Sequence, residues 1–446
     1  MYYTYILRLL RPRALPEKPL SPEGGCMRNT MDLLKTRFMQ ALKASLEQKA
    51  VSWEEEIPPE DWQSLFQFAQ AHHVLPMIYE AVYNCPAAQK AGASLFAPFR
   101  QRAKQMFVMQ ALKTSAFLQL LPALRAAGVT PVVVKGIVCR ELYPNPDARM
   151  SADEDILIPP EQFPECHRVL LESGMRLCDP EVDPSPAYEV PYRSEDGTLY
   201  LELHKHLFPP ESDSYGDFNR FFEGVHHRAV TQMIQGTPVP TMAPTDHLLY
   251  LICHSFKHFL HSGFGIRQVC DICLFADAHG PEINWQHIFD CCRQIHGEYF
   301  TAALFRIGEK HLTFDPERAC CPDFWRELAV DELPMLEDLL DSGVYGGGSM
   351  SRKHSSTMTL HAVAAQKQGK NSSGGVLRAL FPSASSLSGR YPYLKERPYL
   401  LPAAWADRIV KYRKETAAGD NTNSAAASVK IGKERVALLR KYGIIR

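Results

Sequence analysis

The sequence predicts an α+β protein in which a small mixed sheet is flanked by helical units on its N-terminal and C-terminal sides. Apolar residues recur at helical spacing from Met31 to about Gly128, and helical spacing returns from Thr245 onward. Between these regions, short β-branched runs alternate with a single helical segment, which indicates a sheet. A chain of 446 residues is also too long for one compact core, so we expect several packed units.

The composition is that of an ordinary soluble globular protein, with 45% hydrophobic and 22% charged residues. The 49 Lys and Arg residues nearly balance the 50 Asp and Glu residues, so the net charge of -1 gives no general attraction to nucleic acid or to anionic membranes. No apolar run approaches the length needed to cross a bilayer, and we expect no membrane partner.

Twelve cysteines are scattered through the chain. This distribution is typical of reduced thiols, so we expect a cytoplasmic protein without disulfides. Cys270 and Cys273 form the only CxxC motif, and no second CxxC lies at zinc-ribbon distance. Free cysteines are therefore preferred over a structural zinc site.

The N-terminal part of the chain divides into an extension and a helical unit. Residues 1–30 are expected to be disordered, because they are rich in proline and their apolar run is too short for a signal peptide. Residues 31–128 are predicted to be helical. The last helix of this unit is expected from Pro98 to Ala127, with Gly128 in the position of a C-cap.

Residues 129–240 are predicted to form the mixed core that contains the sheet. Strands are expected from Pro131 to Val134, from Asp155 to Ile158 and from Leu199 to Leu207, because these runs are β-branched or alternate in polarity. A helix is expected from Glu161 to Ser173.

The C-terminal half is predicted to be mainly helical. Residues 241–342 form a second helical unit that begins at the capping pair Thr245 and Asp246. Residues 343–376 are rich in Gly, Ser, Lys and Gln, which is typical of a flexible linker. Residues 377–446 are expected to form a C-terminal helical segment that closes with a helix from Ala425 to Tyr442.

The acidic residues of two predicted strands carry the strongest chemical signal. Asp153 and Asp155 lie two residues apart, so both side chains point to one face of the sheet, whereas Glu154 points to the other. Two carboxylates this close repel each other unless a cation lies between them, and Mg²⁺ prefers such oxygen ligands. Glu202 supplies a third carboxylate from the run LYLELHKHL, with His204 on the same face as Glu202. Asp153, Asp155 and Glu202 are therefore the predicted catalytic and metal-binding residues.

Basic residues next to this cluster predict contacts with phosphate. Lys135 and Gly136 end the preceding strand, where a glycine lets an anion approach the backbone and the next helix presents free N–H groups. Arg149 stands four residues before Asp153 and is assigned to phosphate or substrate charge. Glu154 faces the covering helices, so it must lie at the rim of the sheet or find a cationic partner.

These residues resemble the uncharacterised bacterial nucleotidyltransferase family of the polymerase β superfamily, and the resemblance covers most of the chain. The matching features stand here as Lys135-Gly136, Tyr143-Pro144, Arg149-Met150-Ser151, Asp153-Glu154-Asp155 and Glu202-Leu203-His204. The segment with His254, His258, Arg267 and Asp271 is similar to the second helical unit of the family.

The resemblance implies a nucleotidyltransferase-type sheet that binds a nucleoside triphosphate with Mg²⁺ and transfers a nucleotidyl group to an acceptor. It implies Lys135, Gly136, Arg149 and Ser151 as the nucleotide-binding residues. The acceptor, whether small molecule, protein or RNA, is left open. The chain departs from the wider superfamily in two places, because Lys-Gly replaces the usual Gly-Ser and Glu154 stands where an apolar residue is usual.

Two other functions compete with this reading. His254 and His258 lie four residues apart on a predicted helix, a spacing that suits a transition metal, so a His-liganded metallohydrolase is one alternative. It lacks the glutamate of an HExxH motif, because Ser255 follows His254. The other alternative is a catalytically silent nucleotide-binding protein, or a toxin-like or regulatory interaction protein, with long helical flanks as partner surfaces.

Overall fold

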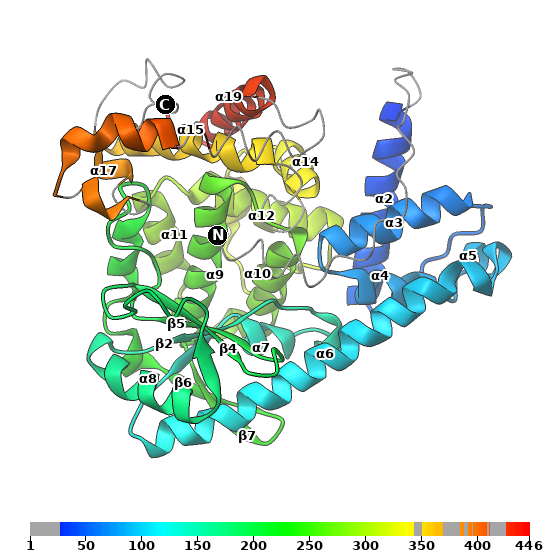
Figure 1. Ribbon diagram of the computed structural model, residues 1–446. Helices are drawn as coiled ribbons and strands as arrows, with labels where there is room; N and C mark the ends of the chain where they lie inside the picture. The colour runs from blue at the N-terminus through cyan, green and yellow to red at the C-terminus, as the bar shows by residue number, and fades with distance from the viewer. Residues whose placement is uncertain are drawn as a thin grey trace.

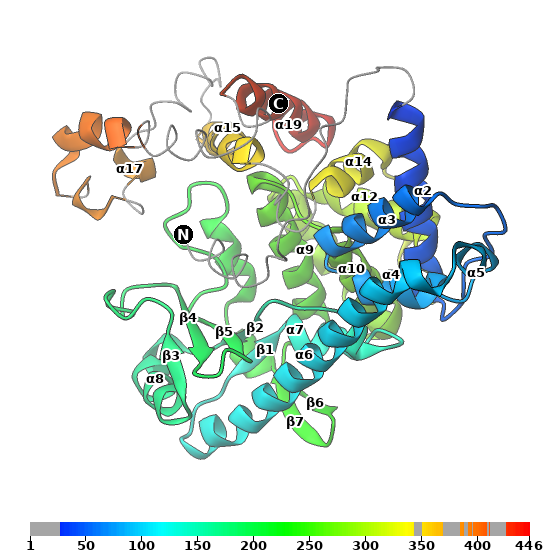
Figure 2. The ribbon, with the colours of Figure 1, turned by 45° about the vertical axis from the view of Figure 1, so that its right-hand side comes forward.

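The computed structural model places one seven-stranded mixed sheet among many helices (Figures 1 and 2). The structure describes residues 27–342, 350–368, 384–387, 391–394, 396–407, 410 and 425–446. The predicted α+β class, a mixed sheet flanked by helical units, is confirmed. The predicted extension of residues 1–30 lies almost wholly outside the described residues.

The sheet has the strand order β3-β4-β5-β2-β1-β7-β6. Its strands are β1 (Val132–Val134), β2 (Glu154–Leu157), β3 (Met175–Leu177), β4 (Glu189–Ser194), β5 (Tyr200–His204), β6 (Val230–Ile234) and β7 (Thr237–Thr241). Strand β2 lies at the centre, antiparallel to β1 and parallel to β5. Side chains from the middle of the sheet are therefore enclosed on both sides by neighbouring strands.

Two helices cover one face of the sheet, namely α6 (Ala93–Ala126) and α8 (Phe163–Glu172). The apolar core on this face joins Phe117 and Leu121 of α6 to Val133, Ile156 and Leu203 of the strands. By length and composition α6 is also the one helix of the described residues that would span a membrane, but 44% of its most apolar stretch is buried inside the protein. Its apolar residues thus contribute to the core.

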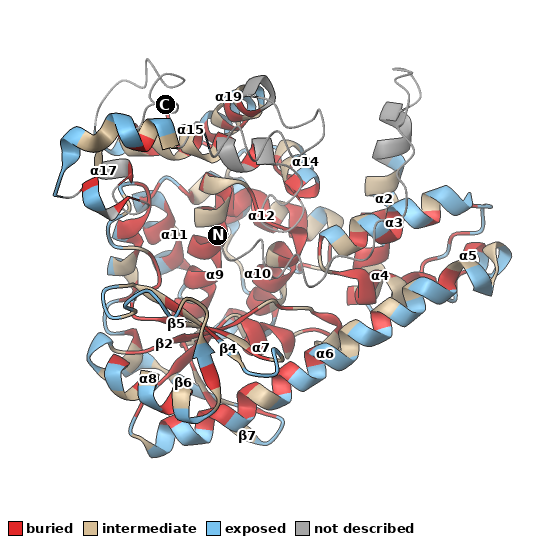
Figure 3. Ribbon diagram, in the orientation of Figure 1, coloured by how far each residue is buried: buried red, intermediate tan, exposed pale blue. Residues whose placement is uncertain are grey.

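The opposite face of the sheet meets α9 (Pro244–His261) and α10 (Ile266–His279), which are buried along most of their length (Figure 3). Val134 and Leu157 belong to the same apolar cluster as these helices. Because side chains alternate along a strand, Asp153 and Asp155 share this face with Leu157. The predicted carboxylates therefore point toward α9 and α10.

Further helices extend the two helical regions on either side of the sheet. On the N-terminal side they are α2 (Met27–Leu46), α3 (Pro59–Ala71), α4 (Leu75–Val82) and α5 (Pro86–Ala91). Between the sheet and the short helix α7 (Gly136–Arg140) runs the loop that carries Lys135. On the C-terminal side α9 and α10 are followed by α11 (Trp285–Gln294), α12 (Glu298–His311), α13 (Asp323–Glu327) and α14 (Leu333–Ser342).

The expected linker of residues 343–376 is wrong over its central part. Residues 350–367 form helix α15 (Met350–Lys367), which packs against α9 and against the last helix α19 (Ala425–Lys441). Thr359 Oγ1 donates to the Leu260 carbonyl at 2.5 Å, and Ala362 and Val363 are buried. The segment is polar in overall composition, but its small residues lie along one side of the helix. These small residues pack against α9 and α19. The rest of the expected linker, residues 343–349 and 369–376, lies outside the described residues.

The cysteines fit the expectation of reduced thiols. Every cysteine that the structure describes is free, and most are buried. Cys270 and Cys273 lie inside α10 as part of the apolar core. No disulfide joins any part of the chain that the structure describes.

Candidate metal and nucleotide site

Strands β2 and β5 bring two of the predicted carboxylates side by side. Asp155 and Glu202 are direct partners in the parallel register, which puts both side chains on the face that meets α9. Asp153 precedes β2 on the same face and is buried. The three acids thus converge at the centre of the sheet, as the alternation of the two strands predicts.

Asp155 is held by two basic groups but keeps one oxygen without a partner. Its Oδ1 lies 2.9 Å from Lys135 Nζ and 3.0 Å from His204 Nε2. Burial raises the pKa of Asp155, yet Lys135 and His204 outweigh burial and lower this pKa to about 2. The Oδ2 atom is buried and accepts no hydrogen bond from any described residue. A buried carboxylate oxygen without a donor is a place where a cation fits.

The other acids repel one another. Burial, followed by the charges of Asp153 and Glu189, raises the pKa of Glu202 well above its usual value. Burial and the charge of Asp155 likewise raise the pKa of Asp153. These pKa directions show that the protein alone does not balance the negative charge of the cluster. A bound cation would balance this negative charge.

Glu189 is a fourth acid at this site, and the sequence reading missed it. It begins β4, where it is the register partner of His204 on β5. Its Oε2 lies 3.7 Å from His204 Nδ1, which is buried and has no hydrogen bond to a described residue. The strand EVPYRS gives little sign of its place, because only the pairing of β4 with β5 brings Glu189 to the cluster.

Among the described residues, one group of three side chains could hold a metal ion. It consists of Asp155, Glu202 and His204, each of which offers a ligand atom within 4.8 Å of the others. His254 and His258 are not part of any such group, so the metallohydrolase alternative finds no third ligand in the described chain.

The imidazoles of α9 instead surround Lys135. Lys135 Nζ lies 3.2 Å from His254 Nε2, which in turn lies 3.2 Å from His258 Nε2. The backbone N–H of Lys135 donates to His247 Nε2 at 3.1 Å. Burial lowers the pKa of all three histidines, that of His247 to about 3, so the rings are neutral. His247 accepts from Lys135, whereas in the pair of His254 and His258 one ring donates and the other accepts. Lys135 is therefore positioned by α9, and its φ of 51° shows that the backbone is strained there.

Glu154, on the other face of β2, finds the cationic partner that its burial requires. Its Oε1 lies 2.6 Å from Arg140 Nη1, and its Oε2 accepts from the backbone N–H of Ile137 at 2.8 Å. A Cβ atom on Gly136 would lie 2.1 Å from Glu154 Oε2, so only glycine fits there. The start of α7 is thus occupied by Glu154, and the expectation of free N–H groups for phosphate is wrong at Ile137.

Two of the predicted nucleotide-binding residues are already engaged by the protein. Arg149 forms a two-point pair with Asp271, with Nε to Oδ1 at 3.0 Å and Nη2 to Oδ2 at 2.6 Å. Ser151 Oγ accepts from Arg140 Nη1 at 2.6 Å and lies 3.3 Å from Glu154 Oε1. Both residues connect the loop before β2 to its surroundings.

Two basic residues absent from the predicted site also hold this loop. Lys113, buried on α6, donates from Nζ to the carbonyls of Ser151 and Ala152, the latter at 2.9 Å. Arg267, at the start of α10, donates to the carbonyl of Met150. Nothing in the sequence around Lys113, which lies within a long helix, indicates that it contacts this loop.

A narrow pocket opens beside Asp155, and Glu202 is not among the residues that line it. Its volume is about 20 Å³, which admits a single water or an ion but not a triphosphate. Its lining includes the predicted residues Lys135, Gly136, Arg149, Ser151, Asp153, Asp155 and His254, together with Arg267 and Asp271. Asp155 therefore belongs both to this pocket and to the group formed with Glu202 and His204.

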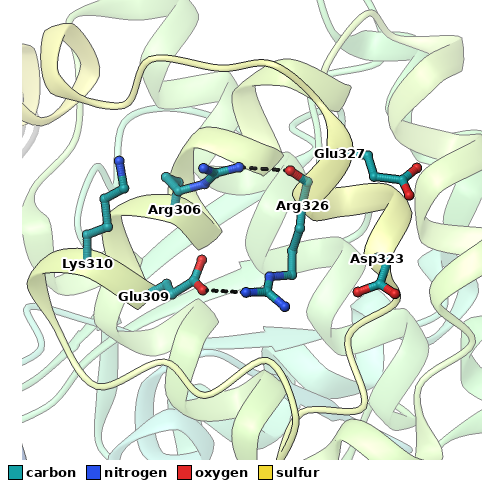
Figure 4. Close-up of a pocket in the computed structure, with 6 residues that line it drawn as sticks. All are labelled: Arg306, Glu309, Lys310, Asp323, Arg326 and Glu327. Atoms are coloured by element: carbon teal, nitrogen blue, oxygen red, sulfur yellow. Dashed lines mark hydrogen bonds and ion pairs between the residues drawn. The ribbon is translucent and has the colours of Figure 1, made fainter.

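A larger pocket of about 420 Å³ lies between α12 and α13 and contains none of the predicted site residues (Figure 4). It is lined by Arg306, Glu309, Lys310, Asp323, Arg326 and Glu327. The Arg326 guanidinium lies 3.1 Å from Glu309 Oε1, so opposite charges are paired within the pocket itself. This arrangement leaves little unbalanced charge for a ligand.

Comparison with known proteins identifies the family of the chain. The model of the uncharacterised nucleotidyltransferase family matches residues 58–312, more than half of the 446 residues. This span runs from the beginning of α3 to the end of α12 and includes the whole sheet. No curated protein and no solved structure matches the chain significantly. From its fold, its acidic cluster and this match, the chain belongs to the uncharacterised nucleotidyltransferase family.

Proposed function

We propose that this protein is a Mg²⁺-dependent nucleotidyltransferase that moves a nucleotidyl group from a nucleoside triphosphate to an acceptor. Family membership supports nucleotidyl transfer as the general activity. The observation that carries the finer proposal is Asp155 Oδ2, which accepts no hydrogen bond from a described residue and lies where Asp153 and Glu202 converge. Three acids, of which Asp153 and Asp155 are buried and Glu202 is half-buried, with too few cations of their own, form a site that attracts a divalent metal.

The residues present fit such a metal. Asp153, Asp155 and Glu202 would hold it through oxygen atoms, which is the ligand type that Mg²⁺ prefers. When bound, the metal would neutralise charge on the phosphates and favour ionisation of the attacking hydroxyl. The raised pKa values of Asp153 and Glu202 agree with this assignment, because a cation would relieve the repulsion that raises them.

Lys135 is the residue that we assign to the triphosphate. Its ammonium group now lies 2.9 Å from Asp155 Oδ1, close to where the metal would bind. A divalent cation bound to the same carboxylate would weaken the Lys135 ion pair, because two neighbouring cations repel each other. The ammonium is then available to a phosphate at the mouth of the 20 Å³ pocket.

Arg149, Ser151, His254 and Gly136 are assigned positioning roles. Arg149 is neutralised by Asp271, so a phosphate would have to break a two-point ion pair in order to bind it. Ser151 links the loop before β2 to Arg140, and His254 orients Lys135. Gly136 makes room for Glu154. The acceptor would approach from the side of Glu202, where His204 is placed to orient that carboxylate.

The test is the thermal stability of wild type and of an Asp153→Asn, Asp155→Asn double variant. Each protein is scanned with ATP, CTP, GTP and UTP, with and without Mg²⁺. We expect at least one triphosphate to raise the melting temperature of wild type only with metal, because a ligand that binds the native state stabilises it. The same additions should not change the melting temperature of the double variant.

A matched control is Asp183→Asn, an acid on an exposed loop of the same sheet region. It should keep the response of wild type. If wild type shows no shift at millimolar triphosphate and metal, nucleotide binding at this site is refuted. The nucleotide that gives the largest shift is then labelled in order to search for the acceptor.

A further inference from the structure

We propose that the group of Asp155, Glu202 and His204 is a second cation position that selects a transition-metal ion such as Mn²⁺ over Mg²⁺. This inference rests on the proposed function, since it concerns the same acidic cluster. It separates the cluster into two chemically different positions that share Asp155 and Glu202. One is the all-oxygen position of Asp153, Asp155 and Glu202, and the other, formed by Asp155, Glu202 and His204, includes a ring nitrogen.

The spacing of the donor atoms fits a metal ion. His204 Nε2 lies 3.0 Å from Asp155 Oδ1 and 3.8 Å from Glu202 Oε2. Ligand atoms around an ion with bonds of about 2.1 Å lie roughly 3 Å apart, so small side-chain movements would bring all three into contact with one ion. The side chain of His204 is 4% exposed and that of Asp155 is 1% exposed, which shields the position from water.

The nature of the donors decides which ion is preferred. Mg²⁺ binds oxygen ligands and keeps much of its water, whereas imidazole nitrogen favours first-row transition ions. Replacement of a water ligand by the nitrogen of His204 therefore costs Mn²⁺ or Zn²⁺ much less free energy than it costs Mg²⁺. The second position thus differs from the first in ligand softness, although both use Asp155.

Metal binding at this position would also satisfy an otherwise unexplained buried atom. His204 Nδ1 has no hydrogen bond to a described residue, and Glu189 Oε2 lies 3.7 Å away. When Nε2 binds a metal, the ring proton must reside on Nδ1, where it can be donated to Glu189 after a short movement. A carboxylate that accepts from a metal-bound histidine is a common supporting contact. Glu189 is then a positioning residue for His204.

The experiment uses the full-length protein after treatment with a chelator. Bound Mn²⁺ is counted from the loss of its free electron paramagnetic resonance signal, and Mg²⁺ is added as a competitor. Pulsed measurements detect coupling to a directly bound ¹⁴N nucleus. We expect Mn²⁺ to bind more tightly than Mg²⁺, with nitrogen coupling from one imidazole.

Two variants identify the nitrogen. His204→Gln should abolish the nitrogen coupling and weaken Mn²⁺ binding about tenfold, while Mg²⁺ binding at Asp153 and Asp155 is retained. The control is His206→Gln, which removes an exposed histidine two residues along the chain and should keep the coupling. Glu189→Gln should weaken Mn²⁺ binding by a smaller factor and keep the coupling.

The outcomes separate this inference from the proposed function. If wild type binds both ions equally and shows no nitrogen coupling, the transition-metal position is refuted but the proposed function stands. Retention of the coupling in His204→Gln also refutes it. If wild type binds neither ion, both the inference and the proposed function fail. If His204→Gln folds poorly, the presence or absence of nitrogen coupling in the wild-type spectrum decides whether the transition-metal position exists.

Discussion

The two faces of strand β2 both bury acidic side chains but balance them in opposite ways. Toward α6 and α7, Glu154 has an arginine, a backbone N–H and a serine hydroxyl around it. Toward α9, Asp155 has an oxygen with no hydrogen bond to a described residue, and two neighbouring acids have raised pKa values. Glu154 and Asp155, which are adjacent on one strand, thus have different roles. The face of β2 toward α6 and α7, here called the closed face, holds the loop before β2 in place. The face toward α9, here called the open face, retains unbalanced charge for a ligand.

The closed face should respond most strongly to mutation. Glu154→Ala leaves Arg140, whose side chain is 1% exposed, buried without its carboxylate. We expect the free energy of unfolding to fall by about 3–5 kcal/mol, measured by urea denaturation. Glu165→Ala removes an exposed partner of Arg168 and should leave the free energy of unfolding nearly unchanged.

A second substitution tests whether the cost comes from the unpaired charge. Adding Arg140→Met to Glu154→Ala removes both charges together, so part of the lost stability should return. If the single variant is as stable as wild type, Glu154 is not the structural acid that the comparison requires.

The free energy of unfolding should depend on pH through His247, a buried histidine of α9 that contacts the loop of Lys135. His247, which accepts from the backbone of Lys135, has its pKa lowered to about 3 by burial and by His279, despite the opposing charge of Asp271. The unfolded chain binds a proton near pH 6.5 and the folded chain does not, so stability falls as the pH drops below 6.5. The loss is about 1.4 kcal/mol per pH unit and ends near pH 3.

Urea denaturation at pH 7.5 and pH 5.5 measures this loss. His247→Asn should lower stability at both values but reduce the difference between them by roughly 1.4 kcal/mol. An unchanged difference would mean that His247 is not held neutral in the folded protein.

The smallest effect should come from an acid of the open face. Burial and neighbouring carboxylates raise the pKa of Glu202, so its charged form destabilises the metal-free protein at neutral pH. Glu202→Gln should therefore raise the melting temperature by roughly 1–3 °C without metal, and should lose the further rise that Mn²⁺ gives to wild type. A fall in the metal-free melting temperature would show that Glu202 is stabilised by its surroundings, which would contradict the contrast between the faces.

The sequence alone determined the fold class, the family resemblance, the strands that carry Asp155 and Glu202, and the place of Asp153 directly before one of them. These properties follow from local patterns, because alternation along a strand places every second side chain on one face. The same alternation separated Glu154 from its neighbours and required a cationic partner for it. It did not identify Arg140, because the sequence contains many basic residues and no signal for the pair.

Strands β3, β4, β6 and β7 and helix α15 were determined only by the tertiary structure. Strand β4 contains Pro191, yet it pairs with β3 on one side and β5 on the other, and this pairing brings Glu189 to the site. Gln235 and Gly236 have the positive φ angles of a tight hairpin turn between β6 and β7, a signal that was available but weak. Pairing between distant segments depends on packing across the whole sheet. This packing places one lysine and one histidine against Asp155 and leaves its other oxygen without a hydrogen bond to any residue that the structure describes.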